Sequence, residues 1–123
     1  MTRAILAAIG VLYLGLGIWC AVQPGKTSRT VGFTLERGAG ESEFLTIYGG
    51  LEFALGLIFL APLVWPQYER PALLACLVVH AGIVLFRSAG FLLYSGIPRT
   101  TVYFAAAEIG LLALCVWRAL VRN

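Results

Sequence analysis

Four long apolar runs dominate the sequence and restrict what the chain can fold into. Each run is 19 to 23 residues long, and together they cover Ala4–Val22, Phe44–Trp65, Ala72–Tyr94 and Thr101–Leu120. An α-helix of about 20 residues crosses the hydrocarbon core of a bilayer. Because lipid offers the backbone no hydrogen-bond partner, and no strand-like alternation is present in the runs, we expect helices. The sequence therefore predicts an all-α integral membrane four-helix bundle.

The composition excludes the common water-soluble classes. Hydrophobic residues make up 60% of the chain and charged residues 12%, whereas a typical soluble domain has about twice that charged share. The net charge of +3 is too small for a nucleic-acid-binding surface and suits flanks that meet anionic lipid headgroups. We therefore expect the lipid bilayer as the environment and no nucleic acid as a partner.

The organisation expected is a single four-transmembrane-helix domain over residues 1–123. Its longest connection, residues 23–43, carries an alternation at Val31, Phe33 and Leu35. A short hairpin, an interfacial cap over the mouth of the bundle and a solvated loop all fit this pattern. Lys and Arg number four on each side of the membrane, so the positive-inside rule does not decide the orientation.

Three ionisable side chains fall at one depth in the predicted spans. Glu52, Arg87 and Glu108 lie seven or eight residues from the same face, the one at which residues 23–43 emerge. At the rise of an α-helix this is about 11–12 Å inside the membrane. Tyr13 reaches a similar depth, and Tyr48 shares a helical stripe with Glu52. We expect these five side chains to converge.

The predicted Glu–Arg–Glu cluster has a definite chemistry. Arg87 stays protonated and its planar guanidinium can contact two carboxylates. Two anions and one cation leave a net negative charge that hydrocarbon disfavours, so we expect Glu52 or Glu108 to hold or share a proton. Two interpretations follow: the cluster lines a binding pocket, or it is a buried ionic staple that only fixes the packing of the helices.

His80 and the cysteines carry weaker signals. His80 lies seven residues from Arg87 on the same stripe, where a hydrogen-bonded core histidine, a proton relay or a metal ligand all fit. Metal-binding companions such as Glu-x-x-His are missing, so we expect no metal site. Cys20, Cys76 and Cys115 lie inside spans and are expected to be inert, although Cys76 and Cys115 fall at comparable depth. No motif predicts a cofactor.

The run Tyr48-Gly49-Gly50-Leu51-Glu52, followed by Arg87 with Gly90 and then Glu108, resembles a known family. This is a domain-of-unknown-function family of small bacterial four-transmembrane-helix proteins, loosely DoxX-like. The resemblance covers most of the chain. It implies a four-helix bundle in the bacterial inner (cytoplasmic) membrane, with Glu52, Arg87 and Glu108 as motif positions. DoxX-like proteins are linked to quinone or sulfur chemistry, but the resemblance implies no substrate here.

Two functions remain open from the sequence. In the first, the protein binds or transports a small polar or amphiphilic ligand, such as a lipid or quinone, with proton exchange. Its ligand-binding residues are Glu52, Arg87, Glu108, Tyr13, Tyr48 and His80. In the second, the protein is a structural or accessory subunit, as a homo-oligomer or in a membrane complex. An enzyme is disfavoured because no nucleophile accompanies the carboxyls.

Overall fold

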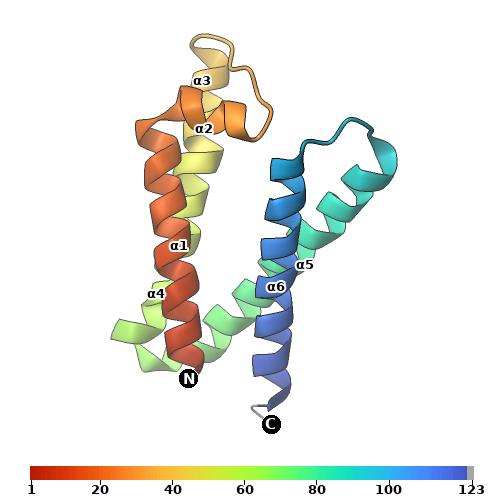
Figure 1. Cartoon of the computed structure of the whole chain (residues 1–123). Coiled ribbons are helices and arrows are strands. Elements are labelled where there is room, and N and C mark those ends of the chain that lie inside the picture. Colours follow the sequence, from red (N-terminus) through yellow and green to blue (C-terminus); the bar gives the residue numbers. More distant parts are fainter. Residues whose placement is uncertain (122–123) are drawn as a thin grey trace. The chain divides into compact units, whose positions relative to one another are not determined.

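A computed structural model describes residues 1–121 of the chain and contains four helices long and apolar enough to span a membrane. These spans are Thr2–Val22, Ala39–Val64, Pro66–Leu93 and Arg99–Val121. They confirm the predicted all-α membrane architecture. In detail the elements are α1 (Thr2–Val22), α2 (Pro24–Thr30), α3 (Ala39–Phe44), η1 (Leu45–Leu51), α4 (Glu52–Val64), η2 (Pro66–Tyr68), α5 (Glu69–Leu93) and α6 (Arg99–Val121), as Figure 1 shows.

The spanning helices leave most of their apolar surface outside the protein interior. Between 11% and 28% of the residues in each spanning window are buried in the protein. Side chains such as Phe86, Leu92 and Leu93 are more than two-thirds exposed. Since water does not tolerate apolar surface on this scale, lipid must cover it. The chain is therefore a multi-pass membrane protein.

The chain divides into two compact units near the start of α5. Unit 1 comprises Met1 and residues 3–69, and unit 2 comprises Thr2 and the residues from Arg70 onward. Unit 1 contains α1, α2, the long helix formed by α3, η1 and α4, and the short η2. Unit 2 contains α5 and α6, joined by the turn at residues 94–98. Each unit is described separately below.

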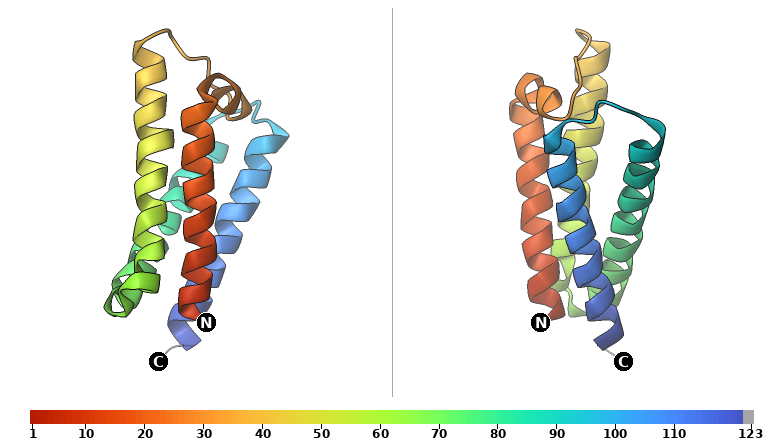
Figure 2. Two further views of the ribbon diagram at one scale, coloured as in Figure 1. Left: turned by 90° about the vertical axis from the view of Figure 1, so that its left-hand side faces the viewer. Right: turned by 45° about the vertical axis from the view of Figure 1, so that its right-hand side comes forward.

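Unit 1 is held together by a close crossing of α1 and the long helix. A Cβ placed on Gly17 would lie 2.8 Å from the backbone nitrogen of Phe53 and 2.9 Å from the carbonyl oxygen of Gly49. A Cβ on Gly10 would lie 2.9 Å from the carbonyl oxygen of Gly56. Two glycines seven residues apart on each helix therefore let the backbones touch, which is how small residues drive helix association in lipid. Figure 2 shows the two helices side by side.

The long helix of unit 1 contains a π-helical segment. η1 covers Leu45–Leu51 and lies directly between α3 and α4, so that the three form one continuous helix (Figure 2, left). A π-helix is wider than an α-helix, is rare, and occurs frequently at functional sites. It contains Tyr48, Gly49 and Gly50 and ends immediately before Glu52. The sequence predicted a helix here but not its π character.

The connection between α1 and α3 forms a helix instead of a hairpin. Pro24 opens α2, and the Thr27 hydroxyl donates to the carbonyl of Gln23 at 2.9 Å. Residues 31–38 then turn back, and the ring of Phe33 meets the ring of Tyr48 edge-on with centroids 5.7 Å apart. This aromatic contact ties the connection to the loop-side end of the long helix.

Candidate functional site

Arg87 and Glu108 form an ion pair that joins the two helices of unit 2. The Nε atom of Arg87 donates to Oε2 of Glu108 at 2.6 Å, and its Nη2 atom donates to Oε1 at 2.5 Å. The side chains are 31% and 17% exposed, so both charges are largely removed from the surroundings. Two parallel bonds of this kind are the strongest geometry available to a guanidinium and a carboxylate.

The short turn between α5 and α6 explains why these two side chains meet. Arg87 lies in the second half of α5 and Glu108 in the first half of α6, so both are close to the turn along the chain. Two helices that run in opposite directions from a short turn bring such positions to one level. An isolated charge in a spanning helix is expensive, and pairing removes most of that cost. The pair therefore joins α5 and α6 at this level.

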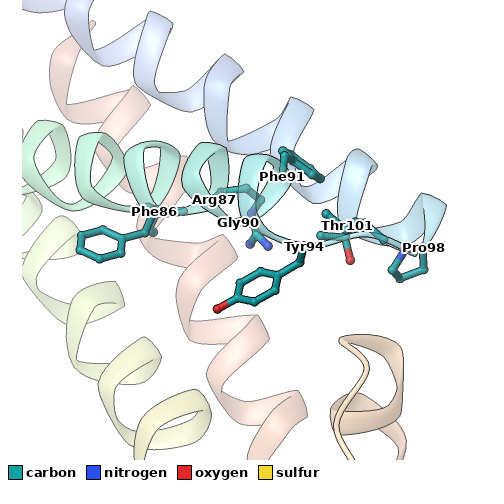
Figure 3. Close-up of a pocket in the computed structure, with 9 residues that line it drawn as sticks. Phe86, Arg87, Gly90, Phe91, Tyr94, Pro98 and Thr101 are labelled. Carbon is teal, nitrogen blue, oxygen red and sulfur yellow. The ribbon is translucent and has the colours of Figure 1, made fainter.

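A groove of about 490 Å³ adjoins Arg87 within unit 2. Arg87 is the one charged residue of its lining among the described residues, and the other lining residues are apolar, aromatic or hydroxyl-bearing: Ile83, Phe86, Gly90, Phe91, Tyr94, Ile97, Pro98 and Thr101. In Figure 3 the phenol of Tyr94 extends from the same side of α5 as the Arg87 side chain. Sites for small ligands combine an apolar wall with a few polar groups in this way.

A second, smaller cavity lies at the ion pair itself. It measures about 60 Å³ and is bordered by Val84, Arg87, Ser88, Phe91, Ala105, Glu108 and Ile109. Arg87 therefore borders both cavities, and Glu108 borders the smaller one. The guanidinium can meet a ligand in the groove, and the carboxyl has space beside it.

The remaining predicted site residues are distributed over both units. Glu52 is half-buried at the first position of α4 in unit 1, so the three-residue cluster with Arg87 and Glu108 stays a prediction. Tyr13 is buried, and its ring meets Phe59 edge-on with centroids 5.4 Å apart. Tyr48, inside the π-helical segment, stacks on Phe44 with ring centroids 4.6 Å apart.

His80 is fully buried in unit 2, where its Nδ1 atom lies 2.8 Å from the carbonyl oxygen of Cys76. Because a carbonyl oxygen only accepts, Nδ1 carries the hydrogen and donates it. This bond orients the imidazole one helical turn from Cys76. It is the arrangement expected for a hydrogen-bonded core histidine, and the proton-relay interpretation stays a prediction.

Cys76 and Cys115 are in direct contact, whereas the sequence indicated only that they lie at comparable depth. Their Sγ atoms are 3.2 Å apart, and both residues are fully buried and free. Comparable depth in the third and fourth spans was the signal that suggested this proximity. No group of three His, Cys, Asp or Glu side chains within residues 1–121 is placed to hold a metal ion.

We expect a bilayer-permeable oxidant to join Cys76 and Cys115 in a disulfide, because a small rotation brings the two sulfurs to bonding distance. The two thiols would lose two protons and two electrons to the oxidant. Labelling of the denatured chain with a maleimide polymer should count three thiols before oxidation and one after it. Cys115→Ser should retain both of its thiols, and three labels after oxidation of the wild type would contradict the observed packing of α5 on α6.

Sequence reasoning did not identify the groove itself. The aromatic residues beside Arg87 were visible as a helical stripe, since Gly90, Phe91 and Tyr94 follow it at spacings of three, four and seven residues. Whether such a stripe faces lipid, another helix or a groove depends on the packing of α5 against α6. That packing is a tertiary property.

Comparison with known proteins assigns the chain to a family. The family model for a domain of unknown function, DUF4345, matches residues 1–119. The chain therefore belongs to this family. No curated protein and no solved structure matches the chain.

Proposed function

We propose that this member of the DUF4345 family binds a small amphiphilic ligand in the groove beside Arg87, in the inner membrane of a bacterium. The polar head of the ligand contacts Arg87, and its apolar part lies along the aromatic and aliphatic wall. Proton exchange with the neighbouring carboxyl accompanies binding. Transport of the ligand across or within the bilayer would follow if the groove opened alternately to two sides.

One observation carries this proposal: a permanent positive charge lines an otherwise uncharged and mostly apolar groove of about 490 Å³ in a pair of apolar helices long enough to span a membrane. The volume falls in the range of about 300–1,000 Å³ that is usual for small-molecule sites. Ionisable residues inside a membrane are rare and commonly mark substrate, ion or proton pathways. The combination favours a ligand with one polar end and one apolar end.

The proposed site is centred on Arg87 and Glu108. Glu52, Tyr13, Tyr48 and His80 stay predicted ligand-binding residues of the chain. The π-helical segment before Glu52 supports this assignment, because such segments recur at functional sites.

The test is the thermal stability of the purified protein with and without candidate amphiphiles. A ligand present at about 100 times its Kd should stabilise the wild type by about 2.7 kcal/mol. Arg87→Leu should abolish this stabilisation, whereas Arg70→Leu, an exposed position at the start of α5, should retain it. Stabilisation that persists in folded Arg87→Leu protein would overturn the proposed site.

A further inference from the structure

The charge of Arg87 is already balanced, and this restricts the ligands that the groove can accept. Glu108 contacts the Nε and Nη2 edge of the guanidinium through both of its oxygens. The pair formed by Arg87 and Glu108 is therefore electrically neutral. An anionic ligand head on that edge would have to replace the Glu108 carboxylate, and hydrocarbon would then disfavour the surplus negative charge.

We propose that the ligand is a single-chain lipid carboxylate, and that it binds together with one proton. This inference rests on the proposed function of the groove. The carboxylate of the ligand takes the place of Glu108 on the guanidinium, and Glu108 accepts one proton and becomes a neutral carboxylic acid. One anion and one proton enter, no covalent bond except the new O–H bond is formed, and the net charge of the site does not change.

The geometry of the pair favours a carboxylate head over other anions. The guanidinium edge already holds a planar carboxylate in two parallel hydrogen bonds of 2.5 and 2.6 Å. A ligand carboxylate reproduces both bonds without a change in the Arg87 side chain. A phosphate monoester carries up to two charges, and Arg87 is the one cation that borders either cavity among the described residues.

The two cavities beside Arg87 suit an exchange of carboxyl groups. The groove of about 490 Å³ has room for one acyl chain along Phe86, Phe91 and Tyr94. The smaller cavity of about 60 Å³ borders Glu108 and gives its displaced carboxyl room, with space for a water molecule. Arg87, Glu108 and Tyr94 are the titratable side chains that border these two cavities in the described part of unit 2.

The experiment compares dodecanoate with its methyl ester on the wild-type protein. Calorimetry in two buffers of different ionisation enthalpy gives both the Kd and the number of protons taken up. We expect dodecanoate to bind at least about tenfold more tightly than the ester, because the ester lacks the charge that contacts Arg87. We also expect an uptake of about one proton per bound dodecanoate.

Glu108→Gln identifies the group that takes the proton. The variant should bind dodecanoate without proton uptake, whereas Glu43→Gln, an exposed residue of α3, should keep the uptake. Equal binding of acid and ester, or proton uptake that persists in Glu108→Gln, would overturn the carboxylate inference and leave the amphiphile site intact. Binding of neither probe, and of no other amphiphile, would overturn the proposed function. The acid-ester comparison decides the inference even where the variant does not fold.

Discussion

Gly17→Ala is expected to destabilise the protein by about 2 kcal/mol, although alanine is the better helix former. The added Cβ would lie 2.8 Å from the backbone nitrogen of Phe53 and 2.9 Å from the carbonyl oxygen of Gly49. Backbone atoms cannot rotate away, so α1 and the long helix must separate, and overpacking of this kind costs about 1–3 kcal/mol. Reversible unfolding in detergent micelles measures the change.

Gly15→Ala is the matched control for this prediction. Gly15 lies two residues away on the same helix, is exposed, and a Cβ there would meet no described atom within 4 Å. Alanine should therefore leave the stability unchanged or raise it by up to about 1 kcal/mol through helix propensity. Equal effects at Gly15 and Gly17 would contradict the glycine-mediated crossing of α1 and the long helix.

Glu108→Leu alone is expected to prevent most of the protein from accumulating in the membrane, and Arg87→Leu combined with Glu108→Leu to restore it. The single change leaves the Arg87 charge without its carboxylate partner, and losing one member of a buried pair costs about 3–5 kcal/mol. The double change removes both charges of the pair, so neither of them is left buried without the other. Quantification of the folded protein in the membrane fraction measures both variants.

The double variant also separates the two interpretations of the ion pair. If the pair lines a ligand site, the double variant folds but loses stabilisation by amphiphiles. If the pair is only a staple, the double variant and the wild type respond to amphiphiles in the same way. A single variant as stable as the wild type would contradict the observed pairing of Arg87 with Glu108.

Several local features of the fold were not accessible from the sequence. The connection at residues 23–43 contains the helix α2, which ends at Thr30. The alternating residues Val31, Phe33 and Leu35, which also allowed a hairpin, follow this helix. The second span begins at Ala39 instead of Phe44, because α3 and η1 continue into α4. The π-helical turn at Tyr48-Gly49-Gly50 has no composition signature, since the same residues also fit an α-helix.

The candidate site was predicted in part. Equal depth in the third and fourth spans indicated that Arg87 and Glu108 meet, and the two bonds between them agree with this. The groove beside Arg87 was not predicted, because its walls come from both α5 and α6 and from the turn between them. The depth of a residue along a helix can be counted from the sequence. Which face of that helix meets its neighbour depends on how the side chains of the two helices pack.

Residue order and hydropathy were sufficient to predict the four spanning helices of a membrane protein, because the length and apolar character of each run leave the backbone no other way to satisfy its hydrogen bonds in lipid. Only the tertiary structure shows which faces of the helices meet. The close approach of Gly17 to the backbone at Phe53 and the contact of Cys76 with Cys115 join segments that are distant in the chain, and the groove at Arg87 forms where α5 and α6 meet around their turn. Such contacts follow from close packing, which no single segment specifies.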